Sequence, residues 1–155
     1  MVAHQDSIEA VRLAARTADR MKATDIVAFD VSQTLGITDA FLLASASNER
    51  LVLAVAEEIE KDLYLAQHRE PRTREGLTEA QWVLLDYGDF VVHVMHDDAR
   101  EFYGLDRLWQ DCPAIDLELP VEGEGVPAAS ASATASGYAD DAVDDTVDDY
   151  AGEGR

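Results

Sequence analysis

The segment from residue 40 to residue 66 constrains the fold more than any other part of the chain. Residues 40–46, AFLLASA, are nearly all apolar, which predicts a strand covered on both faces. Ser47 or Asn48 can cap a helix over about 48–66, in which apolar residues form a wide stripe opposite a row of acids. The segment therefore predicts a strand buried in a sheet, followed by a long helix that packs on that sheet.

A pair of strands follows this helix. Residues 81–87, QWVLLDY, and residues 89–95, DFVVHVM, flank Gly88, and glycine supplies the positive φ that a tight hairpin requires. A strand, a long helix and another strand in this order favour a right-handed parallel crossover, to which the hairpin adds an antiparallel edge.

The rest of residues 1–120 supplies the covering elements. A first helix is expected near Asp6 or Ser7, because Glu9 stands three residues after Asp6 as in a capping box. Residues 25–31 alternate as a strand does, loops are expected at 32–38 and around Pro71, and residues 97–109 predict short helical turns interrupted by a glycine. The predicted fold class is α/β, a small mixed sheet with a parallel crossover and an antiparallel hairpin, flanked by helices.

The chain is strongly acidic, with a formal net charge of -20. Residues 121–155 hold nine acids against Arg155 alone and are rich in Gly, Ala and Ser. Such a segment buries too little apolar surface to offset its ordering entropy, so we predict a folded domain at 1–120 and an acidic disordered tail at 121–155. Paired aspartates recur there every four residues and suggest a calcium or basic-partner segment, but their mutual repulsion favours a solvated tail.

This charge also bears on partners. An acidic chain repels phosphate backbones, so no direct dependence on nucleic acid is expected, whereas a basic protein surface would be attracted. The N-terminus lacks the basic start and apolar run of a signal peptide, and no apolar stretch reaches the roughly 20 residues of a membrane helix. The single Cys112 fits a reducing compartment, so we expect a cytoplasmic protein without a membrane association.

The hairpin carries the residues that most resemble an active site. Asp86 and Asp89 favour a turn role, because aspartate side chains bond nearby backbone amides, with a partner contact or catalysis as alternatives. His93 shares a largely apolar strand face, where a hydrogen-bonded structural role is favoured. His93 and His96 would point to opposite faces of a strand, so we predict no metal site and no cofactor.

Two aromatic residues of the hairpin are candidates for a binding surface. Trp82 is either a core residue or an interface anchor, since a tryptophan often keeps an exposed edge. Tyr87, at the hairpin apex, is expected to project into solvent.

Asp39 raises an enzymatic alternative. Nucleotidyltransferases place two aspartates one residue apart after a glycine loop, where both carboxylates hold magnesium. Here the second position is Phe41, so the metal site would be incomplete.

Taken together, these stretches resemble the bacterial ribosomal silencing factor, or Iojap-like, family. The resemblance covers about 100 residues in one order and is specific as a set. Its matching residues are Thr38 to Phe41, Ser45 to Arg50, Glu75-Gly76, Trp82 to Asp89, Val92 to Val94, Arg100 to Tyr103, and Leu108-Trp109.

The resemblance implies a nucleotidyltransferase-like fold without the catalytic aspartate pair and without enzymatic activity. It implies binding to the large ribosomal subunit through the universal large-subunit ribosomal protein fourteen, steric blocking of subunit joining, and repression of translation in starvation or stationary phase. It further implies a homodimer when the protein is free. A nucleotidyltransferase-like enzyme and a dimeric adaptor for another basic protein are the alternatives.

The resemblance also assigns interface roles to particular residues. Two glycines would shape the backbone approach, and His93 either touches the partner or orders the sheet. The acidic tail is not explained by the resemblance and would aid solubility or modulate the approach to the ribosome. The residues assigned to the interface are Glu75, Gly76, Trp82, Tyr87, Gly88, Asp89, His93, Arg100 and Tyr103.

Overall fold

The computed structural model describes residues 3–120, and those up to Leu119 belong to one compact unit. The predicted acidic tail at 121–155 lies outside the described residues. In chain order the elements are α1 (Gln5–Arg20), β1 (Thr24–Asp30), α2 (Ser32–Leu35), β2 (Ala40–Ala46), α3 (Glu49–Gln67), β3 (Thr73–Glu75), β4 (Trp82–Asp86), β5 (Phe90–His96), α4 (Asp97–Tyr103) and α5 (Leu105–Leu108).

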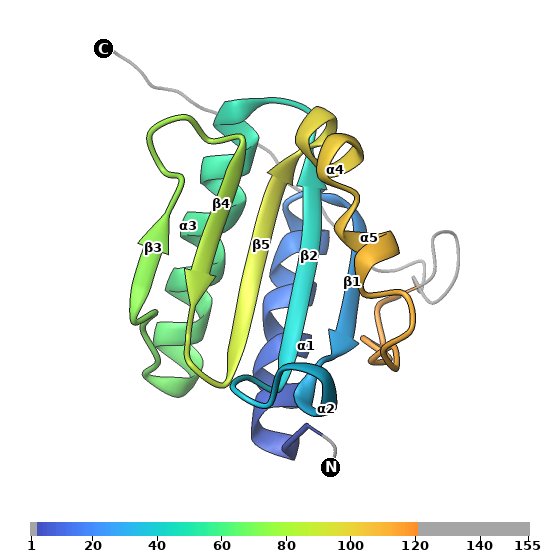
Figure 1. Cartoon of the computed structure of the whole chain (residues 1–155). Helices are drawn as coiled ribbons and strands as arrows, with labels where there is room; N and C mark the ends of the chain where they lie inside the picture. Colours follow the sequence, from blue (N-terminus) through green and yellow to red (C-terminus); the bar gives the residue numbers. More distant parts are fainter. Residues whose placement is uncertain (1–2, 121–155) are drawn as a thin grey trace. The chain divides into compact units, whose positions relative to one another are not determined.

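The five strands form one mixed sheet in the order β1-β2-β5-β4-β3 (Figure 1). β2 and β5 are parallel, and every other neighbouring pair is antiparallel. The predicted mixed sheet, with its parallel crossover and antiparallel hairpin, is therefore confirmed. The strand parallel to β2 is β5 and not β4, because the short strand β3, which lies in a predicted loop, reverses the chain once more before β4 begins.

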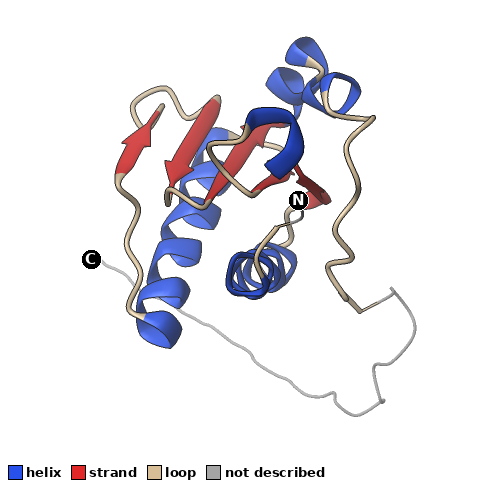
Figure 2. Cartoon of the chain, turned by 60° about the horizontal axis from the view of Figure 1, so that its bottom comes forward, coloured by secondary structure: helices blue, strands red, loops and turns tan. Residues whose placement is uncertain are grey.

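Helices α1 and α3 cover one face of this sheet (Figure 2). Ala10, Ala14 and Ala18 are fully buried in α1, and such small side chains let a helix approach its neighbours closely. α3 buries the predicted apolar stripe, including Val52, Val55, Ile59 and Leu63. β2 lies in the middle of the molecule with every residue except Phe41 buried, as its apolar sequence predicts.

The predicted cap is correct for α3 and wrong for α1. Asn48 caps α3, and its side-chain oxygen accepts a hydrogen bond from the backbone N–H of Leu51 at 2.8 Å. At α1 the predicted capping box is wrong, because the helix begins at Gln5 and Asp6 lies inside its first turn. The cap residue, His4, makes no capping bond with its side chain. A carboxylate within the first turn still favours the helix dipole.

The second face of the sheet is only partly covered, by α4 and α5 (Figure 1). A smaller apolar cluster lies there, in which Leu43 and Met95 pack with Phe41, Trp82 and Trp109. Within residues 3–120, no helix combines the length and the apolar character that crossing a bilayer requires.

Candidate docking site

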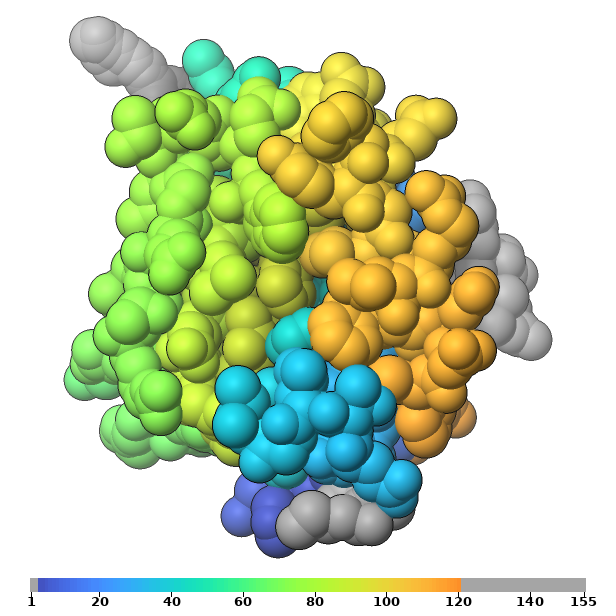
Figure 3. Space-filling view, in the orientation of Figure 1, coloured from blue at the N-terminus to red at the C-terminus, as the bar shows by residue number. Residues whose placement is uncertain are grey.

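Residues of β3 and β4 and of α4 lie at the surface on the second sheet face (Figure 3), and apolar side chains are exposed among them. Residues alternate along β4, so that Val83 and Leu85 are fully buried beneath the sheet. Trp82 and Leu84 point to the opposite face, where they are half-buried. α4 and α5 leave both side chains partly exposed, although Tyr103 of α4 contacts the ring of Trp82.

Trp82 is held in place by two neighbouring side chains. Its indole Nε1–H donates a hydrogen bond to Nδ1 of His93 at 3.0 Å. The ring of Tyr103 lies 4.8 Å from it, centroid to centroid, and Phe102 contacts Tyr103 edge to face at 4.9 Å. Phe102 is 79% exposed and Tyr103 is 53% exposed, so the three aromatic rings form a continuous surface from β4 to α4.

A shallow hollow of about 290 Å³ lies beside Trp82, lined by Glu75, Gly76, Trp82 and Leu84. Gly76 has a φ of +83°, and a Cβ atom there would lie 1.9 Å from the carbonyl oxygen of Trp82. Only glycine fits this close approach of two backbones. We call the whole surface the Trp82 patch, and it consists of Glu75, Gly76, Trp82, Leu84, Phe102 and Tyr103.

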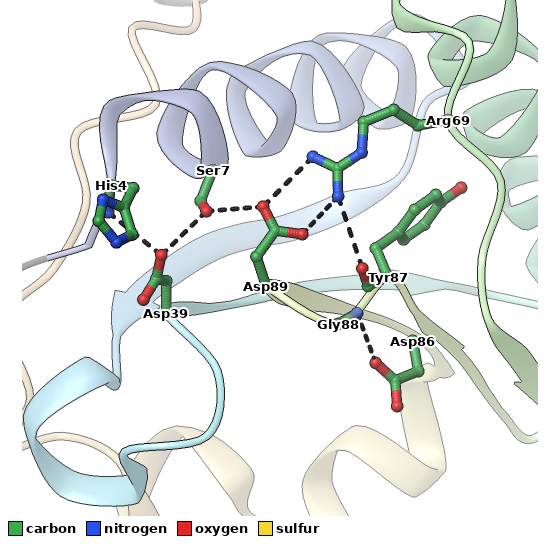
Figure 4. Close-up of polar contacts among 8 residues, drawn as sticks. All are labelled: His4, Ser7, Asp39, Arg69, Asp86, Tyr87, Gly88 and Asp89. Carbon is green, nitrogen blue, oxygen red and sulfur yellow. Dashed lines mark hydrogen bonds and ion pairs between the residues drawn. The ribbon is translucent and has the colours of Figure 1, made fainter.

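The hairpin turn is organised by hydrogen bonds within the chain (Figure 4). Asp86 accepts a bond from the N–H of Gly88 at 2.8 Å, which confirms its predicted turn role. Gly88 has a φ of +92°, as the hairpin was predicted to need. Asp89 instead forms a two-pronged ion pair with Arg69 and accepts a hydrogen bond from Ser7 at 2.7 Å.

These contacts fix the charge of Asp89. Burial alone would raise its pKa, but the bonds from Arg69 and Ser7 outweigh that effect and hold the pKa of Asp89 below its ordinary value. The carboxylate thus joins the hairpin to α1 and to the end of α3. Asp89 therefore pairs with residues of its own chain.

Asp39 belongs to the same network. Its carboxylate accepts from the backbone N–H of His4 at 3.2 Å and lies 3.0 Å from the hydroxyl of Ser7. Phe41, at the position of a second catalytic aspartate, packs edge to face against Trp109 and His93. The one carboxylate of the incomplete aspartate pair therefore anchors the start of α1.

The prediction that Tyr87 projects into solvent is wrong. Tyr87 is 5% exposed and stacks on Phe90 at 4.7 Å, with the rings 10° from parallel. It lies on the same face as Val83 and Leu85, so the alternation along β4 continues through it and turns it into the core. Burial raises the pKa of its hydroxyl, and this hydroxyl has no hydrogen-bond partner within residues 3–120.

Arg100 is also buried, with 8% of its surface exposed. Its guanidinium forms bonds of 2.7 and 2.8 Å to the two carboxylate oxygens of Asp106 and a third bond of 2.6 Å to Ser45. These bonds lower the pKa of Asp106 and hold α4 and α5 against β2. The guanidinium that was predicted to contact a partner thus donates three hydrogen bonds within the protein.

His93 is buried and accepts a hydrogen bond from Trp82, in line with the structural role that its sequence position favours. It is 4% exposed, and burial, together with the nearby charge of Arg100, lowers its pKa to about 4. His96 lies at the start of α4, where its Nδ1 accepts from the N–H of Asp98.

Sequence reasoning did not assign Leu84, Phe102 and the 66% exposed Leu108 to a surface. An apolar residue in a strand or helix normally predicts core, and only the extent of the covering helices shows which side chains stay outside. For Leu84 a signal existed, because it shares the strand phase of Trp82.

The family model described as "Ribosomal silencing factor during starvation" matches residues 4–145. The chain belongs to the ribosomal silencing factor family. The match runs past residue 120, the predicted end of the folded domain, into the acidic segment.

Curated relatives and solved structures agree with this family. Ribosomal silencing factor RsfS of Halalkalibacterium halodurans is 40% identical over 112 residues, which cover 71% of this chain and 93% of that protein. RsfS of Bacillus subtilis is 40% identical over 108 residues, covering 70% of this chain and 91% of the relative. A crystal structure of a Chromobacterium violaceum protein matches with a TM-score of 0.63 at 31% identity, covering 66% of this chain and 84% of the other. The fold expected for the ribosomal silencing factor family is thereby confirmed.

Proposed function

We propose that this protein represses translation by occupying the joining face of the large ribosomal subunit, where it binds the universal large-subunit ribosomal protein fourteen. A body lodged there keeps the small subunit away sterically, and no bond is made or broken. The observation that carries the proposal is the Trp82 patch in a member of the ribosomal silencing factor family. The mechanism requires a docking surface, and the patch offers one.

The composition of the patch suits a protein partner. Exposed aromatic rings at the centre of a surface are the residues that most often dominate binding free energy. Glu75 lies at the rim of the hollow, and the whole chain carries a charge of -20. An apolar surface beside this acid, on a chain of strong negative charge, fits a basic protein and disfavours RNA phosphates.

The structure changes which of the residues we propose as contacts. Glu75, Trp82 and Tyr103 remain, with Gly76 shaping the hollow, and Leu84 and Phe102 join them. Tyr87 and Arg100 support the surface from inside, because their side chains are buried. Asp89, with Gly88, fixes the hairpin on which Trp82 stands.

Co-sedimentation with isolated large subunits tests the proposal. Trp82→Ala should weaken binding by about 30-fold, which corresponds to the roughly 2 kcal/mol of a strong interface residue. Tyr103→Ala should also weaken binding, whereas Tyr64→Ala is the matched control, because Tyr64 is 48% exposed on α3, behind the sheet. Equal binding by wild type and the Trp82 and Tyr103 variants would contradict the proposed surface.

Three accompanying proposals rest on the same family. The free protein is a homodimer, which light scattering over a range of concentrations tests. It acts in the cytoplasm, where its proposed partner is. Residues 1–120 suffice for docking, so a chain that ends at residue 120 should co-sediment like the full chain, and weaker co-sedimentation would contradict this.

A further inference from the structure

We propose that His93 is a positioning residue that fixes the indole ring of Trp82 for docking. The proposal rests on the function proposed above and concerns the same surface. His93 itself is buried, so it acts on a partner only through the tryptophan.

The geometry links the two side chains across neighbouring strands. In the β4–β5 register Trp82 lies opposite Met95 and Leu84 lies opposite His93, so Trp82 and His93 are diagonal neighbours on one face. The indole Nε1–H is a donor only, and His93 Nδ1 accepts it at 3.0 Å. Tyr103 contacts the ring as well. The hydrogen bond therefore selects one orientation of a ring that is otherwise half-exposed.

The chemical state of His93 follows from this bond. An accepting Nδ1 places the proton of a neutral imidazole on Nε2. Nε2 is buried and has no hydrogen-bond partner within residues 3–120. The low pKa, about 4, keeps the ring neutral and the Nδ1 lone pair available near neutral pH.

This arrangement costs folding stability, because a buried donor without an acceptor loses its hydration. A leucine of similar volume would avoid that cost and would pack with Leu43 and Phe41. What leucine cannot do is accept the indole proton. The histidine thus contributes orientation of Trp82 at the expense of stability, and the two properties should separate in variants.

Two substitutions separate them. His93→Leu removes the acceptor and keeps the apolar volume, whereas His93→Asn places an oxygen near the position of Nδ1 but leaves a smaller side chain. The order of stability in urea unfolding should be Leu close to wild type, because relief of the unpaired Nε2–H offsets the lost indole bond, and Asn below both. Binding to large subunits should follow a different order: the Leu variant should bind about 5-fold more weakly than wild type, and the Asn variant should bind more tightly than the Leu variant.

The free protein gives a readout that needs no ribosome. In a Trp109→Phe background Trp82 is the only tryptophan, since the chain has two. A through-hydrogen-bond scalar coupling between its Nε1 and Nδ1 of His93 should be present in NMR spectra of that protein. In His93→Leu the indole N–H signal should shift and the ring should become more accessible to acrylamide quenching.

The outcomes distinguish this inference from the proposed function. If wild type fails to bind large subunits, the proposed function is wrong and the inference falls with it, whatever the NMR coupling shows. If wild type binds, Trp82→Phe weakens binding, and His93→Leu binds like wild type, the inference alone is overturned. Support requires that His93→Leu weakens binding in the Trp82 protein and adds no further loss to Trp82→Phe.

Discussion

Replacing Arg100 by methionine should destabilise the fold by about 2 to 3 kcal/mol. The change removes three hydrogen bonds, leaves the Ser45 hydroxyl buried without its donor, and leaves the carboxylate of Asp106 unpaired. Breaking a fully buried ion pair costs about 3 to 5 kcal/mol. We expect less here, because the Asp106 side chain is 44% exposed and water can hydrate the abandoned charge.

Urea unfolding followed by circular dichroism measures this loss. With a slope of about 1.5 kcal/mol per molar urea for a domain of this size, the midpoint should fall by about 1.3 to 2 M. Arg107→Met is the matched control, because it removes the same charge from the exposed side of α5. Its midpoint should move by less than about 0.3 M, as surface substitutions usually do.

The same pair of variants decides between two roles for Arg100. If the guanidinium contacts the partner, as the resemblance to the family implies, Arg100→Met should unfold at the same urea concentration as Arg107→Met and still lose large-subunit binding. That result would refute the buried role of Arg100. A lowered midpoint at Arg100 alone supports it.

Three further predictions concern the sheet edge and the hairpin. Gly76→Ala should lower both stability and large-subunit binding, because its Cβ would meet the Trp82 carbonyl. Gly36→Ala is the control: it has free space for a Cβ, so it should show only the cost of a positive φ, roughly 1 kcal/mol. Asp89→Asn should cost about 1 to 2 kcal/mol in urea unfolding at pH 7. Because the folded-state pKa of Asp89 is depressed, its stabilisation is fully present above the unfolded-state pKa of about 4 and is lost as pH falls through the folded-state pKa, so the difference from wild type should shrink with falling pH. A pH-independent difference would contradict the ion pair with Arg69. Tyr87→Phe should leave the free energy of unfolding unchanged or raise it by up to about 1 kcal/mol, since the hydroxyl has no hydrogen-bond partner within residues 3–120. A large loss of stability would contradict this and would mean that the hydroxyl is hydrogen-bonded.

Local patterns were sufficient to predict most of the fold. The apolar stripe of α3, the buried β2 and the Gly88 hairpin each depend on side chains whose spacing matches a single element. β3 was missed because its three residues, Thr-Arg-Glu, are all exposed and carry no apolar period. Its pairing with β4 depends on the tertiary structure and not on its own sequence.

The candidate site was predicted less well, for two different reasons. Tyr87 continues the alternation of Val83 and Leu85, so the sequence did contain a signal for its burial. The prediction that it is exposed depended instead on its position at the apex of the hairpin. Arg100 offered no such signal, because its partner Ser45 lies 55 residues earlier in the chain. Its burial depends on how α4 folds back onto β2, which local periodicity does not reveal.

The open face of the sheet follows from where its covering helices end. α1 and α3 fill the rear face, while Gly104, with a φ of +60°, turns the chain between α4 and α5. The chain then runs along the outer edge of β1, where Ala114 pairs with Phe29. The part of the chain that the structure describes therefore leaves β3 exposed and covers Trp82 and Leu84 of β4 only in part. The exposure of the aromatic rings is therefore a consequence of topology, and the function proposed above would require this surface to be rigid. In that proposal His93 and Gly76 would supply the rigidity, whereas the negative charge of the chain would act at longer range and accelerate the approach to a basic partner without fixing its orientation.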